Sequence, residues 1–498
     1  MPSNFNISRG GPPWPPLLSI WRNRRFILVW LLTGLLLSTS CISARRTPNL
    51  EQIFSDARVR TGKRPVIVIP GILGSELINS KTGEKVWPSA FRTADDGLPM
   101  TPDLSANNDD LVPGKIIETV KLARLLPEVY VYRDLLDALR NYAGYREGNW
   151  TNPGSDGDRD TFYVFAYDWR KDNVGNAREL IRQIERLKDQ LHRPDLQFNI
   201  IAHSMGGLIA RYAAMYGNQD LPDDDAEIQP NWAGAQHINK IVMIGVPNEG
   251  ATDAFAILLE GYSITEGLRR RVPLLNKLTA EDAIRSPAVF QLLPHSGTVK
   301  FLDENLNTIV VDLYDPEVWK KYSWTPIYDT DFRNRFANHK TDESGAARLA
   351  DLDAYLAATL KRARRFHQAL DVALTIKQAV PLLAIGGDCE ETLSAPVLMH
   401  DPKSDHWLTL VRPREFKNAN GVKLTKKQVT DAMYAPGDGR VTRKSLLGET
   451  MTNFGGQEKM LRLPLTYAVF GCDLHGKLPG NKSLQDNALT AIVAEAMK

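Results

Sequence analysis

Ser204 has the setting of a reactive serine. It lies in the segment 199–212, NIIAHSMGGLIARY, where residues 196–202 are mostly apolar and residues 208–216 carry apolar side chains at helical spacing. These patterns predict a buried strand and an amphipathic helix with only a sharp turn between them. A serine on such a turn exposes its hydroxyl at the positive end of the helix, in the pattern small-x-Ser-x-Gly that many hydrolases use for a nucleophile.

A serine nucleophile requires a base and an acid. Its hydroxyl is weak at neutral pH unless a histidine accepts its proton and a carboxylate orients that histidine. On a parallel sheet with this kind of turn, the acid and the histidine follow the serine on loops after later strands. His475, which follows the strand expected at 465–470, is therefore the expected base. His203 is expected to be held by the backbone of the turn and not to serve as the base.

Two aspartates compete for the role of acid. Asp388 directly follows the strand expected at 381–385, which is the usual position. Asp438 lies further along, in APGDGRV, where flanking glycines allow a tight turn that directs one carboxylate inward. The spacing leaves this choice open.

Acyl transfer also requires two backbone N–H donors for the negative oxygen of the tetrahedral intermediate. We expect one from Met205, which follows Ser204 at the start of the helix. The other is expected from the loop 71–74, after the strand at 65–70, and most simply from Ile72. An ordinary tight turn is the structural alternative for this loop.

The elements that would position these residues alternate between strand and helix. Further strands are expected at 162–166 and 238–244, and helices near 132–142, 177–191 and 483–497. This alternation predicts an α/β fold, with a mostly parallel sheet and helices on both faces. The core would comprise residues 63–250 and 381–498, preceded by a linker at 42–62. Residues 251–380 lack a convincing strand but include a long charged helix, so we expect a helical cap insertion.

The N-terminus has the pattern of an export signal at residues 1–41. Basic residues at 22–25 precede the 12-residue apolar run FILVWLLTGLLL, which is short for a membrane span. Cys41 after small residues also fits lipoprotein cleavage and acylation, although Ser38 stands where such signals usually have leucine. The chain is therefore expected to be exported, either free or lipid-anchored. The two remaining cysteines, Cys389 and Cys472, could pair or stay free.

Composition argues against a nucleic-acid partner. The formal net charge is only +2, and no basic block is interleaved with aromatic residues outside the N-terminus. The cysteines offer no metal-ligand cluster, so we expect neither a metal nor a cofactor.

Together these residues resemble the lecithin:cholesterol acyltransferase group of α/β-hydrolases, which includes lysosomal phospholipase A2 and phospholipid:diacylglycerol acyltransferases. The matching motifs are PVIVIPGILGSEL (65–77), AGYREG (143–148), YDWR (167–170), AHSMGG (202–207), GVPNEGA (245–251), RSPAVFQLLP (285–294), GDGRVT (437–442) and HGKLPGN (475–481). The resemblance implies an α/β-hydrolase fold and acyl transfer from a lipid ester. It implies Ser204, Asp438 and His475 as the triad and Ile72 and Met205 as the oxyanion donors, so it favours Asp438 over Asp388.

The chain departs from the group in three places. Residues 75–150 contain no cysteine, whereas animal members have a disulfide-closed lid loop there. Arg440 and Thr442 replace the threonine and proline often seen in GDGTVP. The cap matches poorly apart from 285–294, so the acyl acceptor and the lipid head group are not carried over.

The leading functional interpretation is a serine lipase or acyltransferase. It would cleave an acyl ester of a phospholipid or other lipid through an acyl-enzyme, at a membrane surface, and pass the acyl group to an alcohol or to water. One alternative is a soluble carboxylesterase that uses only water. The other is a non-catalytic surface binding module on a hydrolase fold, which a complete serine, aspartate and histidine set disfavours. The sequence leaves the acyl donor, the acceptor and the oligomeric state open.

Overall fold

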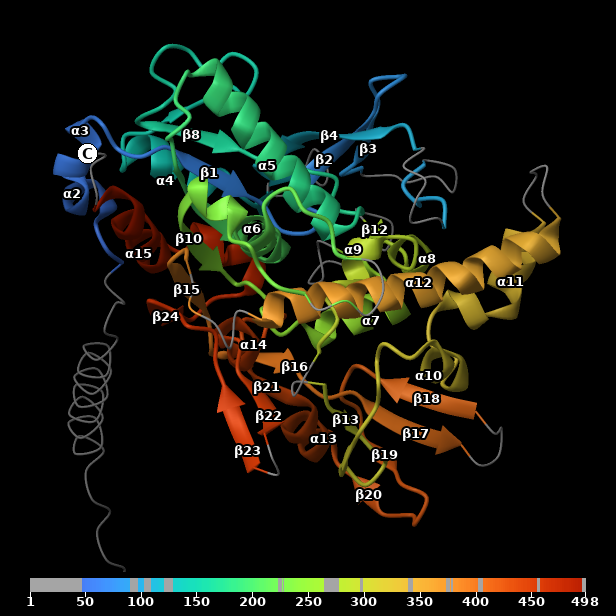
Figure 1. Cartoon of the computed structure of the whole chain (residues 1–498). Helices are drawn as coiled ribbons and strands as arrows, with labels where there is room; N and C mark the ends of the chain where they lie inside the picture. The colour runs from blue at the N-terminus through green and yellow to red at the C-terminus, as the bar shows by residue number, and fades with distance from the viewer. Residues whose placement is uncertain are drawn as a thin grey trace, which may run out of the picture. The chain divides into compact units, whose positions relative to one another are not determined.

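A seven-stranded sheet forms the centre of the chain in this computed structural model (Figure 1). Every pair of neighbouring strands in it is parallel. In spatial order the strands are β24 (Tyr467–Gly471), β15 (Leu382–Gly387), β10 (Ile238–Ile244), β9 (Phe198–His203), β1 (Val66–Ile69), β8 (Thr161–Val164) and β7 (Arg146–Glu147). The predicted parallel α/β fold is confirmed.

Alternation of side chains along the strands gives the sheet two buried faces. On β1, Ile67 and Ile69 join one apolar cluster and Val66 and Val68 join the other. The first cluster packs under α5 (Asn173–Gln190) and α6 (Met205–Tyr216), and the second under α4 (Arg133–Asn141) and α15 (Lys482–Val493). Figure 1 shows these helix pairs along the sheet. Both faces being covered explains why the strands are continuously apolar.

The structure describes residues 47–89, 97–102, 109–120, 129–222, 226, 228–263, 277–295, 299–338, 344–372, 377, 379–401, 406–454 and 457–494. The predicted export signal and Cys41 lie outside these residues. Among the described residues, no helix combines the length and the apolar character needed to cross a bilayer.

The described part of the predicted linker is helical. It contains α2 (Leu50–Ile53) and α3 (Ser55–Val59). Leu50 and Phe54 are each only 3% exposed and belong to the second apolar cluster. Two buried anchors in a polar segment leave little periodicity for the sequence to reveal.

The insertion at 251–380 is mostly helical but also contributes strands. Its longest helix is α12 (Gly345–Asp371), which crosses the view in Figure 1. The other helices are α7 (Thr252–Glu260), α8 (Ala280–Ala283), α9 (Pro287–Phe290), α10 (Pro316–Lys321) and α11 (Thr330–Ala337). The strand β13 (Phe301–Leu302) pairs with β17 (Val397–Asp401) in a four-stranded sheet completed by β14 (Thr308–Ile309) and β18 (His406–Leu410). Strands of two residues are too short to show alternation, so the sequence did not predict them.

Aromatic side chains form the core of the insertion. Phe255 on α7 is fully buried and lies 4.7 Å from Trp324 and 5.9 Å from Trp319, measured between ring centroids. Edge-to-face aromatic pairs at such distances stabilise packing. Phe255 and Leu258 therefore serve as packing residues of the cap.

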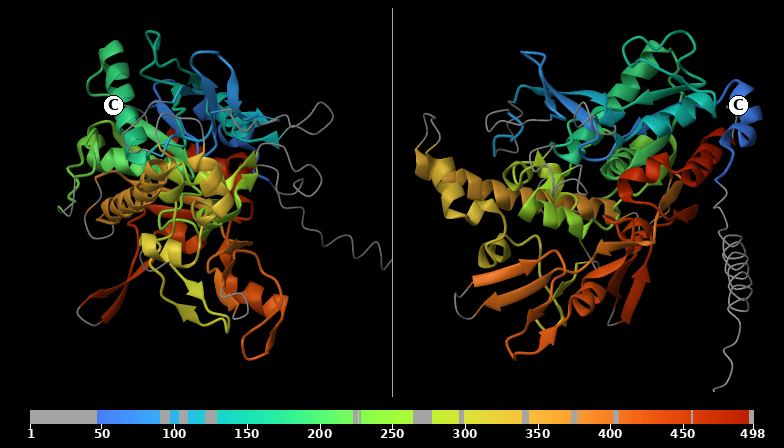
Figure 2. Two further views of the ribbon diagram at one scale, coloured as in Figure 1. Left: turned by 90° about the vertical axis from the view of Figure 1, so that its right-hand side faces the viewer. Right: turned by 180° about the vertical axis from the view of Figure 1, so that it is seen from behind.

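Smaller antiparallel sheets surround the central one. They include β2 (Ser75–Asn79) with β3 (Lys85–Trp87) and β4 (Leu111–Ile116), β16 (Glu390–Leu393) with β21 (Tyr434–Gly437), and β22 (Thr450–Phe454) with β23 (Gln457–Leu461). The helices α13 (Lys426–Met433) and α14 (Arg443–Leu447) flank β21. In Figure 2 the sheet of β2, β3 and β4 is drawn in blue, and the segments from β16 to β23 are drawn in orange and red.

Cys389 and Cys472 form a disulfide, which answers a question that the sequence left open. Cys389 follows β15 and Cys472 follows β24, and these strands are neighbours in the sheet. The disulfide therefore links the two loops that leave the same edge of the sheet.

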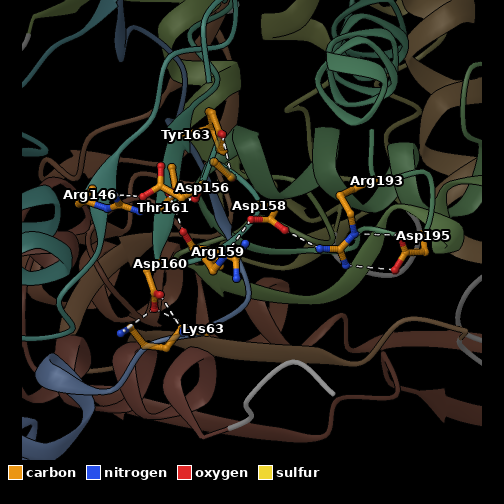
Figure 3. Close-up of polar contacts among 12 residues, drawn as sticks. Lys63, Arg146, Asp156, Asp158, Arg159, Asp160, Thr161, Tyr163, Arg193 and Asp195 are labelled. Atoms are coloured by element: carbon orange, nitrogen blue, oxygen red, sulfur yellow. Dashed lines mark hydrogen bonds and ion pairs between the residues drawn. The ribbon is translucent and has the colours of Figure 1, made fainter. Parts of the chain in front are cut away.

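Three aspartates alternate along the loop before β8, and each meets a basic side chain (Figure 3). The pairs are Asp156 with Arg146, Asp158 with Arg193, and Asp160 with Lys63. Burial would raise the pKa of Asp160, but the ammonium of Lys63 and the backbone N–H groups of Gly62 and Lys63 hold it below its ordinary value. These carboxylates therefore connect the edge of the sheet to the start of β1 and to the segment after α5.

Candidate active site

Ser204 occupies a strained turn between β9 and α6. Its backbone angles are φ 53° and ψ −129°, a region that costs a non-glycine residue about 1–3 kcal/mol. The first turn of α6 passes very close to Pro70 and Val246. A Cβ on Gly206 would lie 2.4 Å from the Pro70 oxygen, and one on Gly207 would lie 2.1 Å from Val246 Cγ2. The two glycines therefore let α6 pack tightly enough to hold the serine in this conformation.

Ser204, His475 and Asp438 lie within hydrogen-bond distance in series. The Ser204 Oγ is 2.9 Å from His475 Nε2, and His475 Nδ1 is 2.8 Å from Asp438 Oδ2. His475 opens a short helix (His475–Gly480) that follows β24. All three residues are buried, at 6%, 8% and 1% exposure. The three come together as predicted, although they are 271 and 37 positions apart along the chain.

The carboxylate of Asp438 is fixed by its own turn. Its Oδ1 accepts hydrogen bonds from the backbone N–H groups of Arg440 and Val441, at 3.0 and 2.7 Å. Burial would raise the pKa of Asp438, but the His475 imidazole and these two N–H groups hold it below its ordinary value. The carboxylate therefore stays charged and can stabilise a protonated His475.

Asp388 does not occupy this position. Its Oδ2 lies 3.5 Å from Arg443 Nη1, and the side chain is 32% exposed. The β16–β21 ladder brings Asp438 back to the end of β15, where a Cβ on Gly387 would lie only 2.8 Å from the Asp438 Cβ. Asp438 thus lies at the strand end where the topology predicted an acid, but it reaches that place from a later loop.

The loop after β1 brings Ile72 close to the serine. A Cβ on the preceding Gly71 would lie 2.7 Å from the Ser204 Cβ. Met205 is the first residue of α6, whose first N–H groups have no partner inside the helix. Within the described residues, no acceptor is found for the backbone N–H of Ile72 or Met205. Both donors are thus available at the place where the sequence expected them.

Two buried aromatic side chains hold this loop in place. The phenol of Tyr167 donates to the Pro70 carbonyl at 3.0 Å, and the indole of Trp87 donates to the Leu73 carbonyl at 3.1 Å. The sequence patterns do not show that these two side chains contact the loop, because the fold creates both contacts. Rigid support of this kind preorganises backbone donors before a substrate arrives.

Tyr132 and His203 link the loop to the base through one directed series of hydrogen bonds. His203 Nε2 lies 3.2 Å from the carbonyl oxygen of His475, so this nitrogen must be the donor. Its Nδ1 then accepts from the Tyr132 hydroxyl at 2.8 Å, and that hydroxyl accepts from the Gly71 N–H at 2.7 Å. Burial lowers the pKa of His203 to about 3, so the ring stays neutral. Both ring nitrogens of His203 are thus engaged, one by Tyr132 and the other by the His475 carbonyl.

Arg440 connects the turn that carries Asp438 to the cap. Its guanidinium pairs with Asp253 on α7 and lies 4.4 Å from the ring centroid of Tyr262. Thr442 caps α14 by accepting from the Ser445 N–H at 3.2 Å. The two departures in the GDGRVT motif therefore have structural roles in the contacts of this turn with α7 and in the capping of α14.

The parallel sheet, the strained serine turn and the Ser–His–Asp series define the α/β-hydrolase class. Residues 121–361 match the model of the family described as lecithin:cholesterol acyltransferase. This match confirms, over that part of the chain, the resemblance carried by the motifs. The match supports lipid-ester hydrolysis or acyl transfer in general terms.

Several solved structures are similar to the chain. A Tle4–Tli4 complex matches with 14% identity over 88% of this chain and 100% of that chain, at a TM-score of 0.49. The mature lipase BlEst2 from Bacillus licheniformis matches with 11% identity over 87% and 92%, at a TM-score of 0.30. The phospholipase PlaB from Legionella pneumophila matches with 14% identity over 67% and 50%, at a TM-score of 0.28. Among the curated proteins, no significant match is found.

Proposed function

We propose that the protein is a serine lipase or acyltransferase that cleaves an acyl ester of a phospholipid or other lipid through an acyl-enzyme. The observation that carries the proposal is the strained Ser204, with its Oγ 2.9 Å from His475 Nε2 and Asp438 2.8 Å from His475 Nδ1. This arrangement can deprotonate a hydroxyl and stabilise the resulting imidazolium in one step.

The first half of the reaction forms the acyl-enzyme. His475 Nε2 takes the proton of Ser204 as the Oγ attacks the ester carbonyl carbon. The carbonyl oxygen becomes an oxyanion, which the N–H groups of Ile72 and Met205 stabilise. His475 then gives its proton to the leaving alcohol oxygen as the ester C–O bond breaks, and Asp438 balances the charge on the imidazole throughout.

The second half transfers the acyl group. An alcohol or a water molecule gives its proton to His475 and attacks the acyl-enzyme through a second oxyanion. The proton returns to Ser204 as the acyl–serine bond breaks. The residues perform the same steps for either acceptor, so the choice depends on which acceptor reaches the acyl-enzyme.

Lipid esters are favoured as substrates because residues 121–361 match a family named for lecithin and cholesterol. The competing function is a soluble carboxylesterase that uses only water, which the same triad would serve equally well. A non-catalytic binding module is a third candidate, and the short triad distances count against it.

Product analysis separates these functions. The purified protein is incubated with vesicles of mixed phospholipids and a long-chain alcohol, and products are identified by mass spectrometry. A lysophospholipid together with an acylated alcohol is the expected result for an acyltransferase, and a lysophospholipid with free fatty acid for a lipase. Turnover of short soluble esters alone would indicate the carboxylesterase, and no turnover by wild type beyond that of Ser204→Ala would leave a binding module.

The proposal includes export of the protein through the signal at 1–41, to act on lipid at a membrane surface. A disulfide between Cys389 and Cys472 supports this, because disulfides persist in oxidising compartments outside the cytosol. The mature N-terminus is expected at or near Cys41, and N-terminal sequencing of exported protein tests this. Retention of residues 1–40 would mean an anchor, and palmitate labelling that disappears in Cys41→Ala would mean a lipoprotein.

A further inference from the structure

A second group of titratable side chains lies at the GVPNEG loop (residues 245–250) and takes no part in the proposed reaction. His295 Nδ1 lies 3.3 Å from Asp371 Oδ2 and 3.8 Å from Glu249 Oε2. Glu249 and His295 are 1% and 3% exposed, and Asp371 ends the long helix α12. The three donor atoms lie within 4.8 Å of one another. We propose that Glu249, His295 and Asp371 form a binding site for a divalent metal ion of the Zn²⁺ type.

The distances fit such an ion. Nitrogen and oxygen ligands of Zn²⁺ lie about 2.0–2.2 Å from the metal in a tetrahedral arrangement, which places neighbouring ligand atoms roughly 3.3–3.6 Å apart. The two distances from His295 Nδ1, 3.3 and 3.8 Å, are close to this spacing. Two carboxylates would also neutralise the two charges of the ion.

The orientation of His295 is that of a metal ligand. Its Nε2 lies 3.3 Å from the Asn248 carbonyl oxygen, so Nε2 carries the hydrogen and donates it. The lone pair of the neutral ring is then on Nδ1, which faces the two carboxylates. A histidine that binds a metal through one nitrogen commonly donates its other N–H to a backbone carbonyl in this way.

His367 provides a second, independent observation. It is 2% exposed, and among the described residues neither of its ring nitrogens has a hydrogen-bond partner. Its ring stacks on His295 with centroids 3.9 Å apart, and it precedes Asp371 by one helical turn of α12. A buried imidazole without partners is costly, by about 1–3 kcal/mol, and a water ligand of a bound ion would supply a partner.

A proton on His295 is the competing occupant. Burial would lower the pKa of His295, but Asp371 and Glu249 raise it above its ordinary value. Arg211, which is buried beside the group, is engaged with neutral acceptors, the Asn248 side chain at 2.9 Å and the Leu370 carbonyl at 2.9 Å. A metal ion and a proton would both bind to Nδ1 of His295, so one excludes the other. A direct measurement of bound metal distinguishes them.

The four side chains come from positions 249, 295, 367 and 371, so no compact motif announced them in the sequence. Only the fold brings the end of α12 against the GVPNEG loop. The site is separate from Ser204, so its failure would leave the proposed function unaffected.

The test measures metal directly. The purified chain is stripped with a chelator, dialysed against Zn²⁺, and its metal content and melting temperature are determined. We expect close to one ion per chain and a higher melting temperature than in the stripped protein. His295→Ala and Asp371→Asn should lose the ion and the gain in melting temperature.

His237→Asn is the matched control, because His237 is 5% exposed and lies elsewhere, 3.1 Å from Lys188 Nζ. This variant should bind the ion as the wild type does. The proposal is overturned if the wild type takes up no stoichiometric metal, or if His295→Ala binds it equally. Either result would mean that a proton on His295, and not a metal ion, lies between Asp371 and Glu249. Should the variants fail to fold, the metal content of the wild type decides alone.

Discussion

At the scale of single residues, the two candidate acids differ in what their oxygens contact. In Asp438, Oδ1 is held by two backbone N–H groups and Oδ2 faces His475. An asparagine there would keep its oxygen toward the two donors and turn its NH₂ toward His475 Nδ1. That arrangement favours the tautomer with the hydrogen on Nε2, which cannot accept the proton of Ser204.

Asp438→Asn should therefore lose roughly 10⁴-fold in kcat, as in the equivalent change of a well-studied protease. Asp388→Asn should lose at most about tenfold, because its exposed ion pair contributes little. Steady-state kinetics on a short ester would check both variants. The opposite ranking would return the role of acid to Asp388.

Tyr132 offers a test of the positioning series at the same scale. Tyr132→Phe removes the acceptor of the Gly71 N–H and the donor to His203 Nδ1. The Gly71 N–H and His203 Nδ1 would then lack partners, which costs about 1–3 kcal/mol. Because these groups hold the loop beside Ser204, kcat should fall on the order of 10-fold or more with little change in KM. The pH profile should keep its shape, because the neutral His203 takes up no proton near neutral pH.

Tyr212→Phe is the control, since its hydroxyl donates to the Gln219 carbonyl at 3.3 Å, away from the serine. It should keep wild-type kcat. Equal losses in the two variants would show that the effect of Tyr132 is a general loss of packing.

At the scale of elements, the disulfide joins the loop after β15 to the loop that carries His475. Cys472 precedes His475 by three positions, and the bridge closes a segment of 83 residues. A cross-link over a loop of that length stabilises a fold by about 2–5 kcal/mol. The pair Cys389→Ala and Cys472→Ala should lose about that amount of unfolding free energy.

Denaturant unfolding with and without reductant measures the effect. Reductant should lower the stability of the wild type toward that of the double variant and leave the variant unchanged. A wild type insensitive to reductant, after its thiols are shown to be free, would mean that the bridge does not stabilise these loops.

Elements were predictable where their sequence pattern was long enough. The strand expected at 196–202 is β9 at Phe198–His203, and the helix expected at 177–191 is α5 at Asn173–Gln190. Such segments are buried on a continuous face and show it in sequence. The ladder of β16 with β21 has four pairs and gave no such pattern, yet it decides that Asp438 and not Asp388 reaches His475.

The residues of the candidate site also differ in whether a sequence pattern indicates them. Ser204 and His475 follow strands with clear patterns, so both were located from the sequence. Tyr132 and Trp87 contact the loop 71–74 across 61 and 14 positions, through contacts that only the fold creates. The pairing of the cysteines also required the fold, because β15 and β24 are far apart in sequence but adjacent in the sheet.

At the scale of the whole molecule, neutral buried histidines make stability depend on pH. Burial lowers the pKa of His203 from 6.5 to about 3, so between these values the unfolded chain binds a proton that the folded chain does not. The stability that this group contributes is fully present above pH 6.5 and is lost as the pH falls toward 3.

Unfolding free energy measured from pH 6.5 down to pH 4 should therefore fall, and His203→Gln should flatten the dependence by up to one proton, about 1.4 kcal/mol per pH unit. His192→Gln serves as the control and should keep the wild-type slope. An unchanged slope in His203→Gln would mean that His203 is not held neutral.

The central claim is that Ser204 is the nucleophile of the proposed reaction, and covalent labelling tests it most directly. A fluorophosphonate probe reacts with an activated serine, and peptide mass spectrometry locates the adduct. We predict one adduct per chain, on Ser204, with none in Ser204→Ala and much slower labelling in Asp438→Asn. An adduct on another residue, or labelling that persists in Ser204→Ala, would contradict the account.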